Sequence, residues 1–103
     1  MRALLASKSP EVAQLCARHR VVRLSVFGSA ARGSFKAGQS DVDLLVEFEA
    51  MPPAEHASHY FGLQEDLETL LSTPVDLIES KPIRNPFFRH AVETGKVLLF
   101  EAA

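Results

Sequence analysis

Apolar and polar residues recur at two different spacings along the chain, and these spacings divide it into expected helices and strands. In residues 54–71, Tyr60 and several leucines are mostly three or four positions apart, which is typical of a helix that buries one face. Residues 21–27 (VVRLSVF) are apolar and β-branched and end at Gly28, which indicates a buried strand. We also expect a helix that opens at Ser9-Pro10, strands over 41–48, 75–78 and 97–100, and a helix from Asn85-Pro86 to about Gly95.

The order of these elements predicts an α/β (α+β) fold, in which helices flank a mixed β-sheet of about four strands. A chain of 103 residues is long enough for one core and too short for two, so a single domain over 1–103 is expected. The composition, 47% hydrophobic and 23% charged, is that of a folded globular protein.

Charge and cysteine content narrow the classes of partner and the compartment. The net charge of -2 argues against duplex nucleic acid as the main partner, because such binding needs a basic face, whereas a nucleotide remains compatible. No apolar stretch approaches the roughly 20 residues that span a bilayer, so no membrane contact is expected. Cys16 is the single cysteine, which excludes an internal disulfide and favours the cytoplasm.

A Gly-Ser pair follows the first expected strand. Gly28 and Ser29 stand before a short helical turn expected at 30–33, so backbone N–H groups and the Ser29 hydroxyl could bind a phosphate, with Arg32 one turn further on. An ordinary turn is the alternative. A Walker P-loop is disfavoured, because Ser34 stands where that motif requires lysine.

Two carboxylates, Asp41 and Asp43, stand at the head of the second expected strand. Their spacing of two places both side chains on one face, where a cation such as Mg²⁺ would relieve their repulsion. A solvated strand entry is the alternative, but the fully apolar run that follows disfavours it. A phosphatase of the haloacid dehalogenase type carries its acid pair after a strand, and an EF-hand requires an acid or amide where Leu45 stands, so neither fits.

Asp76 stands between apolar residues of the short strand expected at 75–78. It is either a solvent-facing residue of an edge strand or a third carboxylate that shares a site with Asp41 and Asp43. The second interpretation requires the two strands to be neighbours, which spacing alone does not determine. Cys16 is expected to be a core residue. The histidines at positions 19, 56, 59 and 90 form no convincing metal-binding set: positions 56 and 59 are three apart near the start of a helix, but helical histidines are usually surface residues.

These motifs carry a resemblance to a known family. Residues 27–33 (FGSAARG) and 40–44 (SDVDL) resemble the G-S-x-A-R-G…S-D-x-D-L signature of the minimal nucleotidyltransferases, which belong to the DNA polymerase beta-like nucleotidyltransferase superfamily. Residues 66–68 (DLE) and 74–77 (PVDL) stand where that family has its D-L-E helix and V-D-L strand. One departure is visible: eleven residues separate Ser29 from Asp41 where ten are common, and the extra residue is expected in the polar loop before Asp41.

The resemblance implies a function and a set of site residues. Gly28, Ser29 and Arg32 would bind the triphosphate of ATP. The acids Asp41, Asp43 and Asp76 would hold Mg²⁺, and Asp76 would also activate the acceptor hydroxyl. Family members of this size are often antitoxins paired with a helical HEPN toxin. The resemblance therefore implies a protein adenylyltransferase that transfers AMP to a toxin tyrosine and acts as a type VII-like antitoxin.

Two other functions remain open from the sequence. A non-catalytic antitoxin would neutralise its partner by binding alone, although such a module has no need of three carboxylates. A subunit of a small-molecule nucleotidyltransferase, acting for example on an aminoglycoside, would need an acceptor-binding part, for which a chain of 103 residues leaves little room. Homo- and hetero-oligomers are both compatible with the sequence. The Phe87-Phe88 pair is expected to be mostly core, with one ring available to a partner.

Overall fold

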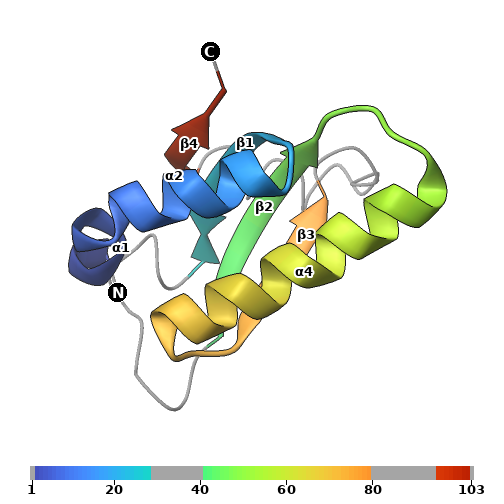
Figure 1. Cartoon of the computed structure of the whole chain (residues 1–103). Helices are drawn as coiled ribbons and strands as arrows, with labels where there is room; N and C mark the ends of the chain where they lie inside the picture. Colours follow the sequence, from blue (N-terminus) through green and yellow to red (C-terminus); the bar gives the residue numbers. More distant parts are fainter. Residues whose placement is uncertain (1, 29–40, 80–94, 103) are drawn as a thin grey trace.

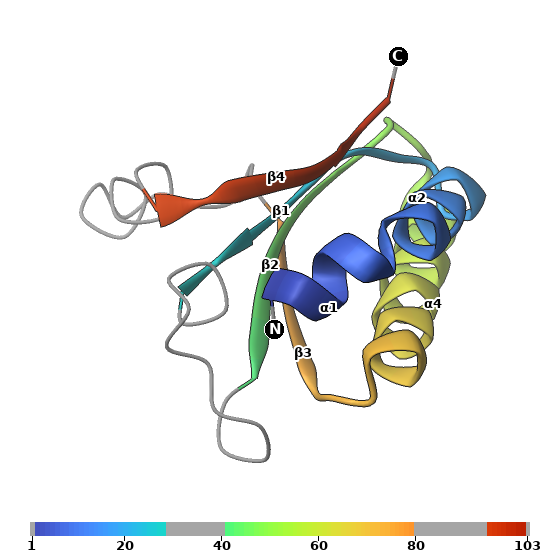
Figure 2. The same cartoon turned by 90° about the vertical axis from the view of Figure 1, so that its left-hand side faces the viewer.

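The computed structural model describes residues 2–28, 41–79 and 95–102, which form a four-stranded sheet with three helices packed on one of its faces (Figures 1 and 2). The sequence predicted an α+β arrangement with a mixed sheet of about four strands, and this prediction is confirmed. Within the described part, no helix is long and apolar enough to cross a membrane.

The helices are α1 (Arg2–Ser7), α2 (Ser9–Arg18) and α4 (Pro53–Leu71). Helix α2 has a proline in its first turn, where a missing N–H costs nothing, as expected from Ser9-Pro10. It ends at Arg18, and His19 is its C-cap residue. Helix α1 was not expected, because six residues are too few to establish a helical period.

The strands are β1 (Val21–Phe27), β2 (Val42–Phe48), β3 (Val75–Glu79) and β4 (Val97–Glu101). They lie in the order β3-β2-β1-β4, and β1 is antiparallel to both β2 and β4. Strands β2 and β3 are parallel, and α4 connects them across one face of the sheet (Figure 1). The described sheet is therefore mixed, and its one parallel pair contains two of the candidate acidic residues, Asp43 and Asp76.

Most of the expected bounds agree with the structure within one residue, and β1 agrees at both ends. One shift concerns the candidate site, because β2 begins at Val42 and Asp41 therefore precedes the strand instead of opening it. The turn expected at 30–33 and residues 85–94 of the helix expected after Asn85-Pro86 lie outside the described residues.

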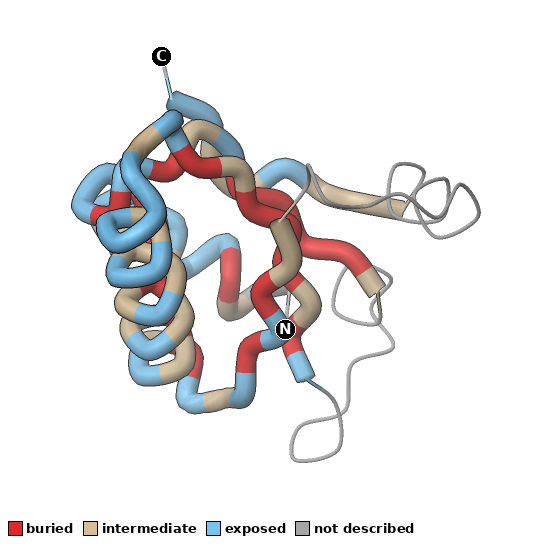
Figure 3. The backbone as a smooth tube through the Cα atoms, turned by 90° about the vertical axis from the view of Figure 1, so that its right-hand side faces the viewer, coloured by how far each residue is buried: buried red, intermediate tan, exposed pale blue. Residues whose placement is uncertain are grey.

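The main core lies between the sheet and the helices, as the buried positions in Figure 3 indicate. Along β2, Val42, Leu44 and Val46 point towards α2 and α4, and each is fully buried. Because side chains alternate across a strand, Asp43 and Leu45 point to the opposite face. That second face, which we call the open face, carries a smaller apolar cluster of Phe27, Leu45 and Ile78.

The turn between α4 and β3 places a non-glycine residue in the left-handed region. Ser72, the C-cap of α4, has φ 52° and ψ 39°, a conformation in which its Cβ crowds the backbone. We expect Ser72→Gly to raise the free energy of unfolding by about 0.5–1 kcal/mol, because glycine adopts this conformation without that strain. Urea unfolding measures the difference.

A matched control for this prediction lies on the same helix. Ser58 is exposed in the body of α4, where glycine costs backbone entropy and relieves no strain. Ser58→Gly should therefore lower the free energy of unfolding by about 0.5 kcal/mol. Equal losses in both variants would contradict the assignment of strain to position 72.

Candidate active site

Two of the predicted site carboxylates lie side by side on the open face. Asp43 and Asp76 are each the second residue of their strand, and the parallel pairing of β2 with β3 places them directly opposite each other in register. Neighbouring strands lie roughly 4.8 Å apart, so both side chains leave the sheet at the same height and on the same side. The condition that the sequence could not test, that the two strands are neighbours, is therefore met.

The backbone of Gly28 lies against the Asp43 carboxylate. Gly28 has φ +69°, and a Cβ built at this position would lie 2.5 Å from Oδ2 of Asp43, closer than any side chain tolerates. The contact arises because β1 is antiparallel to β2, and the pairing of Phe27 with Asp43 brings the end of β1 beside the start of β2. The end of β1 and the acidic pair thus belong to one site, and the positive φ at its junction favours glycine.

The other predicted residues of the site are placed less completely. Asp41 is exposed and lies immediately before β2, two residues from Asp43. Ser29 and Arg32, which the sequence assigned to the triphosphate, lie outside the described residues. The structure therefore brings together Gly28, Asp43 and Asp76.

The open face differs in charge balance between its two ends. At the far end, Arg23 forms ion pairs with Glu47 at 2.7 Å and with Glu101 at 2.9 Å. At the near end, Asp76 has no cationic partner within the described residues, and the apolar cluster of the open face lies beside both aspartates. Two neighbouring carboxylates repel each other, and a bound cation would offset that repulsion.

The donor chemistry of the pair suits a hard divalent cation. Mg²⁺ takes one or two carboxylates and completes its octahedron with water and substrate oxygens. The described ranges contain no group of three or more His, Cys, Asp or Glu side chains arranged to hold a metal by themselves. Asp43 and Asp76, with Asp41 two residues away in the sequence, are carboxylates of the kind that such an ion takes.

The histidines take part in separate contacts. His19 is buried between α2 and α4, with Nε2 2.8 Å from Oδ2 of Asp66 and Nδ1 3.2 Å from Nδ1 of His59. His56 instead contacts the carboxylate of Glu79. The pair at positions 56 and 59, spaced like metal ligands on a helix, thus points to two different partners. The sequence offered no sign of the His19–Asp66 contact, because 47 residues separate the two.

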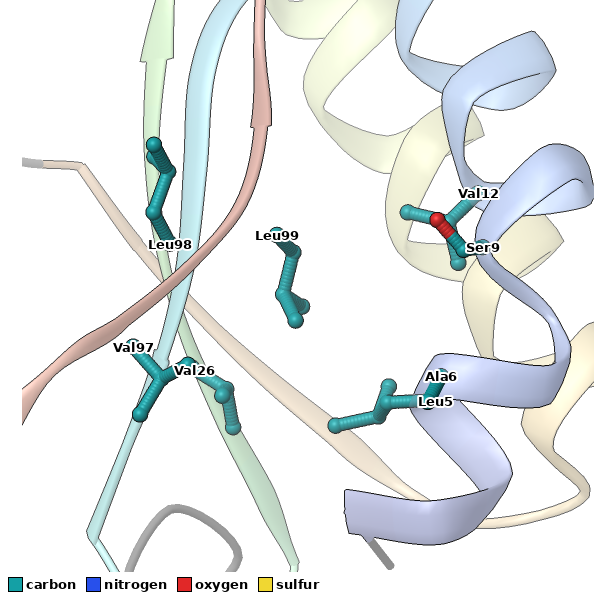
Figure 4. A pocket seen from close by; sticks show the side chains of 8 residues that line it. All are labelled: Leu5, Ala6, Ser9, Val12, Val26, Val97, Leu98 and Leu99. Atoms are coloured by element: carbon teal, nitrogen blue, oxygen red, sulfur yellow. The ribbon is translucent and has the colours of Figure 1, made fainter.

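An apolar cavity lies on the opposite side of the sheet from the acidic pair (Figure 4). Its volume is about 260 Å³, and it lies between α1, α2 and the strands β1 and β4. Leu5, Val26 and Leu99 line it, and the Ser9 hydroxyl is the one polar side-chain group among the described residues that line it. A triphosphate would find neither charge nor hydrogen-bond donors in sufficient number there, so this cavity is not the candidate site.

The chain matches the family model described as a nucleotidyltransferase domain over residues 12–99. It is 38% identical over 76 residues, 74% of each chain, to a Methanocaldococcus jannaschii protein named as a candidate protein adenylyltransferase. It is also 39% identical over 72 residues to the protein adenylyltransferase MntA of Thermococcus cleftensis, covering 70% of this chain and 69% of the relative.

Two solved structures have the same fold. One is described as a candidate minimal nucleotidyltransferase and is 37% identical, with a TM-score of 0.67 and a coverage of 90% of each chain. The other belongs to a complex of a tri-AMPylated Shewanella oneidensis HEPN toxin with an MNT antitoxin. Its matched chain has a TM-score of 0.63 and 16% identity, with coverage of 95% of this chain and 73% of the other, so this likeness concerns the fold alone.

The close contact at Gly28 leads to a first prediction about the site. In Gly28→Ala, the new methyl group would displace the Asp43 carboxylate and strain the backbone, so the free energy of unfolding should fall by about 1–2 kcal/mol. NMR spectra should show shifts centred on Asp43. Gly95→Ala is the matched control, because a Cβ there meets nothing within 4 Å. Similar losses in the two variants would argue against a specific Gly28–Asp43 contact.

The burial of Cys16 leads to a second prediction. The side chain is fully buried on α2, and desolvation raises the pKa of its thiol to about 12. In the folded protein, Cys16 should therefore react with a thiol reagent such as DTNB at pH 8 no faster than the protein unfolds to expose it. In urea, where the protein is denatured, Cys16 should react fully. Rapid stoichiometric labelling of the native protein would contradict this burial.

Proposed function

This chain belongs to the nucleotidyltransferase domain family, and we propose that it is a Mg²⁺-dependent protein adenylyltransferase that transfers AMP from ATP to a tyrosine hydroxyl of a HEPN-type toxin. The observation that carries the proposal is the pairing in register of Asp43 with Asp76, beside the backbone of Gly28. Relatives of this chain are named as protein adenylyltransferases, which supports the choice of reaction.

The proposed roles combine the positions of the described residues with what the sequence motif implies. Gly28, together with Ser29 and Arg32, would bind the triphosphate through backbone N–H groups and the guanidinium. Asp41, Asp43 and Asp76 would hold the metal. When bound, Mg²⁺ supplies charge neutralisation for the phosphoryl oxygens and alignment of the attacking and leaving oxygens.

In the proposed transfer, the acceptor oxygen forms a bond to the α-phosphorus of ATP, and the bond from that phosphorus to the leaving pyrophosphate breaks. The proton of the acceptor hydroxyl passes to the carboxylate of Asp76, which is exposed and therefore reachable from outside the sheet. Because little covalent chemistry falls to the protein, the positions of the carboxylates determine most of the rate.

The acceptor is proposed to lie on another protein. The open face carries the carboxylates and is free of the three described helices, so a partner can approach it without displacing α1, α2 or α4 (Figure 2). A HEPN toxin is the proposed partner because one structural neighbour comes from a complex of an AMP-modified HEPN toxin with an MNT antitoxin. We place this reaction in the cytoplasm, where ATP is available.

The carboxylate roles are tested by the double variant Asp41→Asn, Asp43→Asn, co-expressed with a HEPN-domain toxin. Amide side chains bind Mg²⁺ weakly, so transfer should fall by about a thousand-fold or more while the fold persists. Labelled ATP and intact-protein mass spectrometry would detect each AMP added to the partner. Glu65→Gln, an exposed carboxylate on α4, is the matched control and should retain transfer.

The outcomes separate the proposed enzyme from its alternatives. Transfer retained in the double variant would refute the metal assignment. Suppressed toxicity with no added AMP in the unsubstituted protein would indicate an antitoxin that acts by binding alone. Transfer of AMP to a small molecule, with none to the partner, would place this chain in a small-molecule transferase.

A further inference from the structure

Strand β3 lies at one end of the described sheet, and its outer edge faces away from β2. The N–H of Val42 in β2 donates to the carbonyl of Pro74 at 3.0 Å, so the backbone groups of Pro74 and Asp76 point towards β2. Backbone groups alternate in direction along a strand, and those of Val75 and Leu77 therefore point outward. Such outward groups need partners wherever a helix covers them.

Side chains of α4 supply those partners. The side-chain amide of Gln64 donates to the carbonyl of Val75 at 3.0 Å, and the carboxylate of Glu68 accepts the N–H of the same residue at 2.9 Å. One turn before Gln64, the hydroxyl of Tyr60 donates to the carbonyl of Leu77. Three outward groups of β3 are thus bound by three side chains of one helix.

Part of the spacing along α4 matches the spacing along β3. Residues 60 and 64 are four apart, which is about 6.0 Å along a helix axis, and the carbonyls of Leu77 and Val75 that they bind are two residues apart, or roughly 6.6 Å along a strand. Glu68, one turn further on, binds the N–H of the same Val75. Helix α4 therefore contacts the edge of β3 with a row of side chains in the place where another strand would otherwise pair.

We propose that Tyr60, Gln64 and Glu68, which we call the edge clamp, are positioning residues that hold Asp76 in register with Asp43. The inference rests on the proposed function only for the role of Asp76 in transfer. Glu68 and Gln64 bind the backbone immediately before Asp76, and Tyr60 binds the backbone immediately after it. The Asp76 carboxylate itself points to the open face, so the clamp acts through the strand backbone.

Two features make β3 dependent on this clamp. The strand has five residues, and within the described sheet it pairs with β2 alone, in the parallel arrangement that is the less stable one per residue. A shift of one residue in that pairing would also turn Asp76 to the helix side, away from Asp43.

Tyr60 remains a donor over a wide pH range, because burial and the nearby Glu79 and Asp76 raise the pKa of its hydroxyl.

The experiment compares Glu68→Ala, which removes the acceptor for the Val75 N–H, with Glu68→Gln, which keeps a carbonyl oxygen there. Glu65→Ala is the control on the exposed side of the same helix. Hydrogen exchange followed by NMR monitors the amide of Asp76, which faces β2, against the amides of β1, which is paired on both sides. In parallel, kcat and KM for ATP are measured on the partner toxin.

In Glu68→Ala we expect exchange at Asp76 to rise about ten-fold or more relative to β1, because β3 opens locally. We expect kcat to fall about ten-fold or more and KM for ATP to rise by less than that, because Asp76 is the proposed base but only one of three proposed metal ligands, and the proposed triphosphate contacts lie at the end of β1. Glu68→Gln should restore both quantities to within about three-fold, and Glu65→Ala should change neither. If Glu68→Ala does not fold, Gln64→Ala, which removes one neutral hydrogen bond, takes its place.

Several results would overturn the edge clamp. Exchange that rises equally in β1 and β3 would mean that Glu68 stabilises the whole fold and not β3 in particular. Unchanged exchange together with unchanged kcat would mean that Glu68 neither holds β3 nor positions Asp76. A loss of kcat with unchanged exchange would show that Glu68 acts other than by holding β3. If the unsubstituted protein transfers no AMP, the proposed function fails, and the exchange measurement still decides whether the clamp exists.

Discussion

The parallel pairing of β2 with β3 is the constraint on which the candidate site depends. It sets Asp43 beside Asp76, although 33 positions separate them in the sequence, and it fixes which face of the sheet carries them. Antiparallel neighbours can be joined by a short turn, but a parallel pair needs a crossover, and α4 provides it here. The longest described helix therefore links the two strands and also supplies the side chains that bind the edge of β3.

Because side chains alternate between the two faces of β2, its core residues and its candidate site residue point in opposite directions. The even-numbered residues Val42, Leu44 and Val46 are buried against the helices, whereas Asp43 points to the open face. Gly28 belongs to the same side of the sheet as Asp43, because the antiparallel β1–β2 register brings its backbone against the Asp43 carboxylate. An acidic residue can thus follow a buried one without being trapped in the core, since the pleat directs them to opposite sides.

Much of the fold followed from local patterns in the sequence. The apolar runs at 21–27 and 41–48 and the periodic leucines of 54–71 predicted β1, β2 and α4 within one residue at each end, because burial on these elements is regular. Helix α1 was not predicted, since two leucines in six residues do not define a period. The prediction that Asp41 opens a strand was wrong by one position, because strand pairing there begins only at Val42.

The candidate site was only partly predictable for a different reason. Spacing placed Asp41 and Asp43 together, but the meeting of Asp43 with Asp76 depends on the order of strands in the sheet, which no local pattern contains. The edge clamp was likewise hidden, because Gln64 and Glu68 are ordinary helix-forming residues whose importance arises from the strand beside them. The Gly28–Asp43 contact is of the same kind, since it needs the β1–β2 register.

The clamp between α4 and β3 also has a consequence for the order in which the molecule is built. Its hydrogen bonds join residues 7, 11 and 17 positions apart, whereas the ion pair of Arg23 with Glu101 joins residues 78 apart. Short loops close at a lower entropic cost than long ones, so contacts of this kind form readily while a chain is still emerging from the ribosome. The helix and edge strand that position Asp76 can therefore assemble as a local unit during synthesis, before β4 is available to complete the sheet.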